Sequence, residues 1–140
     1  MNEPELIQEI LSKTKTIALV GYSPKPGRPS GMIAQYLQQH GYRVIPVNPS
    51  IEEALGEKAY PSIAAIPEKV DLADVFRRPE YIPGVVDDAI AAGVKYLWIQ
   101  DGIIHDEAAR KAEEAGIGVV MDRCIFRDHA RGLAAGPRRK

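Results

Sequence analysis

An apolar run that stops at a glycine, residues 16–21, restricts the possible folds of this chain more than any other segment. The run 17–20 is entirely apolar and ends at Gly21. A loop with three prolines and two basic residues follows, and a helical pattern begins at Ser30. A strand, a glycine-bearing turn and a helix amino terminus in this order place backbone N–H groups around a phosphate. The segment therefore predicts a phosphate-binding turn in a nucleotide-type ligand site.

Apolar runs and amphipathic segments alternate along the rest of the chain. The apolar runs predict strands at 16–20, 43–48, 71–76, 95–100 and 118–121, and the helical periodicity predicts helices at 4–13, about 30–40, 82–92 and about 106–115. Segment 50–69 is weakly periodic and is interpreted as a connection with a short strand near 59–60. Strands that alternate with helices of this length are typical of βαβ units, so the sequence predicts an α/β fold with a parallel sheet.

Two details of the segment 30–48 are predicted from single residues. Ser30 is expected to be the N-cap of helix 30–40, and Gly41 is expected to end it. Pro46 cannot donate a hydrogen bond to a sheet ladder, which disfavours regular pairing at the end of strand 43–48.

Length and composition indicate one globular domain. The chain has 140 residues, of which 45% are hydrophobic and 26% charged, enough for one sizeable core. We expect a single domain over 1–133 and a loose basic tail over 134–140. A net charge of -1 gives no general case for nucleic-acid or membrane binding. With no long apolar run and no signal-peptide pattern at the amino terminus, we expect a cytoplasmic protein.

Ligands of open α/β sheets bind beyond the carboxyl ends of the strands. The residues at these predicted ends are Gly21, Tyr22 and Ser23, with Lys25 and Arg28 in the following loop, then Val47, Asn48 and Pro49, then Phe76, Arg77 and Arg78, and last Gln100, Asp101 and Gly102. Each of them alone has an ordinary structural explanation, such as a turn glycine or a solvated arginine. Together they supply donors, cations and small residues, which suits a polyanionic ligand.

Two common nucleotide motifs are absent. A dinucleotide fingerprint needs Gly-x-Gly-x-x-Gly and an acid about twenty residues later, whereas the chain has Gly21-x-Ser23 and a second strand that ends in Asn48-Pro49. Gly-x-x-x-x-Gly-Lys-Ser/Thr is also missing. Nicotinamide cofactors and a conventional P-loop NTPase are therefore disfavoured.

The remaining reactive side chains are interpreted as structural. His40 is expected to pack on a helix face, and His105 to cap or pack at a helix start. Cys124, the one cysteine, excludes an intramolecular disulfide and an all-cysteine metal site, and is interpreted as a buried small side chain. His129 lies in a polar segment without an obvious partner. No metal cluster, Ser/His/Asp set or pair of carboxylates can be assembled from the sequence.

The chain resembles the small, stand-alone coenzyme A-binding proteins of bacteria and archaea. These are related to the coenzyme A-binding domain at the start of the succinyl-CoA synthetase alpha subunit. The resemblance covers about residues 14–126, with matching segments at 20–30, 41–49, 55–60, 70–79, 98–102 and 119–124. It implies a Rossmann-like, three-layer αβα fold with a five-stranded parallel sheet, and coenzyme A bound across the strand ends.

The resemblance also implies a role for each candidate site residue. Gly21, Tyr22 and Ser23, with Ser30 and Gly31 at the helix start, would hold the pyrophosphate; Arg28 would face phosphate; Val47, Asn48 and Pro49 would lie near the adenosine; and Phe76 and Arg77 would border the other wall. Tyr22 stands where small residues are common in that family.

No catalysis comes with this resemblance. The related synthetase needs a phosphorylated histidine from a second domain and a nucleotide-grasping partner subunit, and we expect neither within this chain. The sequence therefore favours a module that binds coenzyme A or an acyl-CoA, with an acyl-CoA enzyme as a candidate partner. Two alternatives stay open: a small enzyme acting on another nucleotide or phosphorylated metabolite, and a structural module that contacts a partner through its basic tail.

Overall fold

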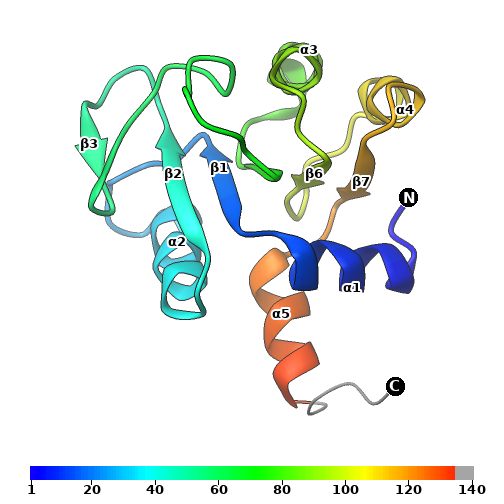
Figure 1. The fold of residues 1–140 in the computed structure, drawn as a ribbon, viewed down its shortest axis with the longest axis horizontal. Helices are drawn as coiled ribbons and strands as arrows, with labels where there is room; N and C mark the ends of the chain where they lie inside the picture. The colour runs from blue at the N-terminus through cyan, green and yellow to red at the C-terminus, as the bar shows by residue number, and fades with distance from the viewer. Residues whose placement is uncertain (135–140) are drawn as a thin grey trace.

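The computed structural model describes residues 1–134 as one alternation of strands and helices (Figure 1). The main sheet contains β1 (Thr16–Val20), β2 (Arg43–Val47), β5 (Leu72–Val75), β6 (Tyr96–Ile99) and β7 (Gly118–Met121). The helices are α1 (Pro4–Lys13), α2 (Pro29–Gln39), α3 (Ile82–Ala92), α4 (Asp106–Glu114) and α5 (Ile125–Ala134). The connections hold the short strands β3 (Glu53–Ala54) and β4 (Glu57–Lys58) and the 3₁₀ turn η1 (Pro79–Tyr81).

The five strands of the main sheet are all parallel, in the order β2-β1-β5-β6-β7. Helices α1, α2 and α5 cover one face of this sheet, and α3 and α4 cover the other (Figure 1). The predicted Rossmann-like, three-layer αβα architecture is confirmed. None of the helices within residues 1–134 has the combination of length and hydrophobicity that a membrane span requires.

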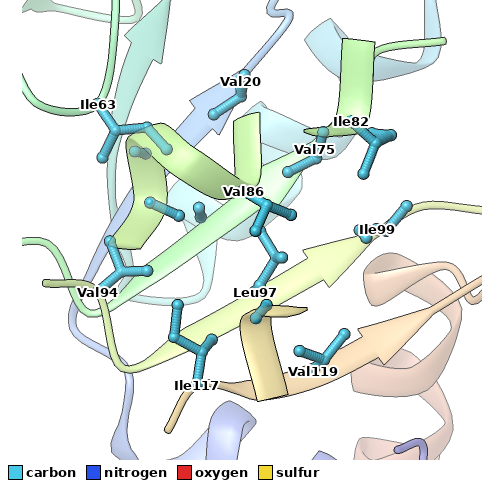
Figure 2. Close-up of a cluster of buried hydrophobic side chains, with 14 of the residues drawn as sticks. Val20, Ile63, Val75, Ile82, Val86, Val94, Leu97, Ile99, Ile117 and Val119 are labelled. Carbon is cyan, nitrogen blue, oxygen red and sulfur yellow. The ribbon is translucent and has the colours of Figure 1, made fainter. Parts of the chain in front are cut away.

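The inner strands are buried on both sides, which explains why they read as continuous apolar runs. All four residues of β5 and of β6 are buried. Figure 2 shows the core on the α3–α4 side, where Val86 of α3 lies over side chains of the sheet such as Val75 and Leu97. On the opposite face Trp98 is fully buried and donates from its ring nitrogen to the Arg123 carbonyl at 2.9 Å.

Pro46 fits into β2 because this strand lies at the edge of the sheet. Pro46 lies opposite Leu19 in the register with β1, but its carbonyl points away from β1, toward the outer side of the edge strand. There its carbonyl accepts from the Tyr60 N–H at 3.1 Å, and the Asn48 N–H donates to the Tyr60 carbonyl at 2.9 Å. The edge therefore needs no N–H from position 46, and the strand pairs regularly up to Val47.

Two structured segments were not predicted. Residues 53–58 form an antiparallel hairpin of two very short strands inside the weakly periodic connection. Residues 125–134 form α5, which packs against α2, and the Tyr36 hydroxyl and His129 Nδ1 are 2.7 Å apart at this contact. Burial and the neighbouring His40 lower the pKa of His129. The predicted tail begins at Ala134, the last residue of α5, and the rest of it lies outside the described residues.

Candidate functional site

The strand order places a switch point between β1 and β5. These two strands are neighbours, but the helices that follow them, α2 and α3, lie on opposite faces of the sheet. The chain therefore diverges just beyond the carboxyl ends of β1 and β5, at Gly21 and Phe76. Such a divergence opens a crevice in α/β sheets, and ligands bind there.

Gly21 allows these two strand ends to approach each other closely. Its φ is +86°, a left-handed conformation that side chains disfavour. A β-carbon at this position would lie 2.7 Å from the Phe76 carbonyl oxygen and 2.9 Å from the Arg77 Cδ. The turn after β1 can therefore sit against the end of β5 only when residue 21 has no side chain.

Ser30 ties the turn to the start of α2, but it is not the predicted N-cap. Helix α2 begins one residue earlier, at Pro29, with Arg28 in the N-cap position and no side-chain cap. Proline suits the first helical position because its fixed φ is already helical. Ser30 is 2% exposed, and its hydroxyl accepts a hydrogen bond of 2.9 Å from the Ser23 N–H. Its oxygen therefore orders the turn instead of the helix end.

Two cavities open at this corner of the sheet, each with a volume of about 580 Å³. The polar cavity is lined by Tyr22, Pro24, Lys25, Asn48, Pro49, Ser50, Ile51, Arg77, Arg78 and Tyr81. The apolar cavity is lined by Pro29, Ser30, Met32, Ile33, Gln100, Asp101, Ile103, Cys124, Phe126 and Arg127. Gly21, Ser23, Arg28 and Phe76 line both. The two cavities therefore meet at the turn between β1 and α2.

Positive charge gathers in the polar cavity. Lys25, Arg28, Arg77 and Arg78 line it, and its described lining residues include no carboxylate. The Arg77 guanidinium carbon lies 4.2 Å from the centre of the Tyr81 ring, which holds this cation at the cavity wall. Arg78 is the more exposed of the pair, as predicted, with 74% of its side chain exposed. The first-turn amides of α2, which have no intrahelical acceptor, add further donors at the same corner.

A hydrogen-bonded asparagine fixes the loop on the far side of the polar cavity. The Asn48 amide nitrogen donates to the Tyr22 carbonyl at 2.7 Å, and its oxygen accepts from the Ser50 N–H at 2.7 Å. The loop after β2 is thereby joined to the turn after β1. This arrangement holds Pro49 at the cavity surface.

Most of the predicted site residues line one or both cavities, and two do not. Val47 is a core residue of β2, 4% exposed, and its carbonyl accepts from the Gly21 N–H at 3.1 Å. Gly31 lies behind the turn, where a β-carbon would be 3.6 Å from the Ser23 carbonyl oxygen. Val47 supports the turn from within the fold and Gly31 packs against it, whereas the other nine predicted residues line the cavities.

Sequence reasoning missed Asp74, a fully buried acid in the middle of β5. Neither of its carboxyl oxygens has a hydrogen-bond partner among the described residues. Burial raises the pKa of this carboxyl well above its ordinary value. Asp74 lies between Leu19 and Trp98 in the sheet register, two residues before Phe76 at the cavity. An acid inside an otherwise apolar central strand was the available signal.

The side chains interpreted as structural behave accordingly. His105 precedes α4, and its Nδ1 accepts from the Ala108 N–H at 3.1 Å, as an N-cap does. Cys124 is buried. Within residues 1–134, no group of three or more histidine, cysteine or acidic side chains could hold a metal ion.

Comparisons with known proteins agree with this geometry. A family described as CoA binding domain matches residues 15–130. The chain is 44% identical over 124 residues to Uncharacterized protein YneT of Bacillus subtilis, covering 89% of this chain and 92% of the relative. A solved structure, described as a hypothetical protein from Pyrococcus horikoshii OT3, is similar with a TM-score of 0.88 at 47% identity, covering 92% of this chain and 91% of that one.

The same segment occurs within a much larger enzyme. Acetate–CoA ligase (ADP-forming) I of Archaeoglobus fulgidus is 32% identical over 127 residues, which cover 84% of this chain but only 18% of the ligase. The match therefore concerns a small part of that protein. The family match, in contrast, extends over most of the 140 residues and includes every strand of the main sheet. The chain belongs to the CoA-binding domain family.

Proposed function

We propose that this protein binds coenzyme A across the carboxyl ends of its strands and performs no chemical step of its own. The observation that carries the proposal is the cationic cavity at the switch point, closed on one side by the turn between β1 and α2. The phosphates would bind at this turn, and the adenosine would lie against the loop that contains Asn48 and Pro49.

The groups around the turn supply enough free energy for a phosphate ligand. A helix amino terminus contributes about 0.3–1 kcal/mol per nearby anion. A hydrogen bond from a charged donor contributes about 1.5–3 kcal/mol, and Arg28 and Arg77 can each make one. Together with burial of an adenine face, these contacts approach the roughly 8 kcal/mol that micromolar binding needs.

The chemistry of the lining favours binding over catalysis. The described side chains of the polar cavity supply hydrogen-bond donors, cations and apolar surface, and include no carboxylate, histidine or thiol. Such a set can hold a polyanion, but it lacks histidine, which serves most often as a general base or acid, and it lacks carboxylates. Because an acetate–CoA ligase contains a matching segment as a small part of its length, we infer that an acyl-CoA enzyme is the partner that uses the bound ligand.

Removal of one arginine from the polar cavity is expected to weaken coenzyme A binding by about 10- to 150-fold, the loss of one charge-assisted hydrogen bond. The variants are Arg28→Ala and Arg77→Ala, and isothermal titration measures their affinity. Arg110→Ala is the matched control, because Arg110 is an exposed arginine of α4 outside both cavities.

The three variants separate a site effect from a general charge effect. The proposal predicts losses for Arg28→Ala and Arg77→Ala that shrink at high salt, and an unchanged affinity for Arg110→Ala. Equal affinities in all three variants would place the ligand elsewhere. A wild-type protein that releases no heat and shows no thermal shift at millimolar coenzyme A would remove the proposal.

A further inference from the structure

The apolar cavity is a second compartment next to the phosphate-binding turn. Its wall consists of Met32 and Ile33 from α2, Ile103 from the loop after β6, and Phe126 from α5. Its volume of about 580 Å³ falls within the roughly 300–1,000 Å³ that small-molecule sites occupy. The polar cavity continues into it past Gly21. A ligand whose phosphates bind at the turn can therefore extend into both compartments.

Gln100 adds a polar side chain with a free donor to the lining of this cavity. Gln100 is 4% exposed, and its amide oxygen accepts from the Ile125 N–H at 3.2 Å. Its amide nitrogen carries two donor hydrogens and has no hydrogen bond to any described residue. This nitrogen is not among the buried side-chain atoms of the described residues that lack a partner, so it faces the solvent of the cavity. It is therefore free to donate to a carbonyl oxygen of a ligand, where a hydrogen bond in place of one to water adds about 0.5–1.5 kcal/mol.

The wall also leaves large apolar side chains in water. Met32 is 67% exposed and Phe126 is 36% exposed, and they are two of only a few large apolar side chains within residues 1–134 that are so exposed. Free coenzyme A ends in a thiol and adds no hydrocarbon beyond it. An acyl chain attached to that sulfur would cover Met32 and Phe126 and would present a thioester carbonyl to the donor of Gln100.

From these observations we propose that the physiological ligand is an acyl thioester of coenzyme A with a short aliphatic chain. This inference rests on the proposed function. The apolar cavity would hold the pantetheine arm and the acyl chain. The rim of the apolar cavity limits the length of the acyl chain. There Arg127 and Asp101 form an ion pair of 2.7 Å, and both side chains are half-exposed. A chain that extends beyond the apolar wall meets charge and water at this pair.

Isothermal titration with coenzyme A and with its acetyl, butyryl, hexanoyl and palmitoyl thioesters tests the inference. Each buried methylene is expected to strengthen binding about fourfold. The gain should stop once the chain reaches the rim, so palmitoyl-CoA should bind no more tightly than hexanoyl-CoA.

Three variants test whether the affinity gained from the acyl chain comes from contacts in the apolar cavity. Met32→Ser should reduce the ratio of hexanoyl-CoA to coenzyme A affinity by about fivefold, the loss of one to two methylenes of contact. Gln100→Glu keeps the acceptor for the Ile125 N–H and removes the donor, so the ratio of acetyl-CoA to coenzyme A affinity should fall about tenfold. Ile104→Ser is the control, because Ile104 is 50% exposed and lies outside the cavity wall.

The outcomes separate this inference from the proposed function. If coenzyme A binds and its affinity does not depend on the acyl chain, the inference is wrong and the proposed function stands. If the chain dependence persists in Met32→Ser, or falls equally in Ile104→Ser, the chain binds elsewhere and the inference is again wrong. If neither coenzyme A nor any thioester binds, the proposed function itself is wrong.

Discussion

Gly21→Ala is expected to lower the free energy of unfolding by about 2–5 kcal/mol and to abolish coenzyme A binding. The left-handed backbone at φ +86° costs a residue with a side chain about 1–2 kcal/mol. The new β-carbon would also lie 2.7 Å from the Phe76 carbonyl oxygen, and extra atoms in a closely packed place cost about 1–3 kcal/mol. Relief of this contact would separate the turn from the end of β5 and distort the phosphate site.

Gly41→Ala is a matched control for this prediction. Gly41 has a similar φ of +94°, but a β-carbon there would meet nothing within 4 Å. The Gly41→Ala variant should lose only the free energy of unfolding that a left-handed backbone costs, about 1–2 kcal/mol. It should bind coenzyme A normally. Urea unfolding and isothermal titration of both variants provide the comparison. Equal losses of stability, with binding intact in both, would show that the close approach at Gly21 has no importance.

Asp74→Asn is expected to stabilise the protein at neutral and alkaline pH. Because burial raises the pKa of Asp74, the folded state holds a proton that the unfolded state releases above about pH 3.9. The contribution of Asp74 to stability is therefore fully present below that pH. It is lost as the pH rises, at up to about 1.4 kcal/mol per pH unit, until the pKa of the folded state is passed. Asparagine cannot ionise and avoids this loss.

Urea unfolding between pH 4 and pH 9 measures this effect. The wild type and Asp74→Asn should have similar stabilities near pH 4, where both side chains are neutral, and the variant should be increasingly the more stable one at higher pH. Glu53→Gln is the control for the loss of a carboxyl group, because this side chain is exposed on β3. Parallel profiles for the wild type and Asp74→Asn would show that the carboxyl is not held neutral by burial.

The fold was predictable because strands that are buried on both faces of a sheet have continuous apolar sequences. The apolar run 17–20, for example, is a central strand with neighbours on both sides. Pro46 remained ambiguous because its effect depends on which side of β2 is unpaired, and this depends on the order of strands that are distant in the chain. Helix α5 was missed because its polar sequence gains its partner, α2, only in the folded protein.

The site was predictable as a region and less so in its details. Successive strand ends identified the corner at Gly21 and Phe76, since parallel strands end at the same edge. The prediction that Ser30 is an N-cap was wrong. A sequence shows that a serine can cap a helix, but it does not show that the backbone N–H of Ser23, seven residues earlier, donates to the same hydroxyl oxygen. Asp74 was overlooked because the strand was predicted from its apolar neighbours. Only the structure shows that the carboxyl oxygens of Asp74 have no hydrogen-bond partner among the described residues.

Mapping of the bound ligand by nuclear magnetic resonance tests the central claim most directly. Isotope-labelled protein is titrated with coenzyme A, and the backbone amide signals are followed to saturation. The largest shifts are expected in the turn and helix start at 21–31 and at Phe76 and Arg77, with little change in the hairpin 53–58. Saturable binding that leaves the amides of 21–31 unchanged and shifts another surface would contradict the account.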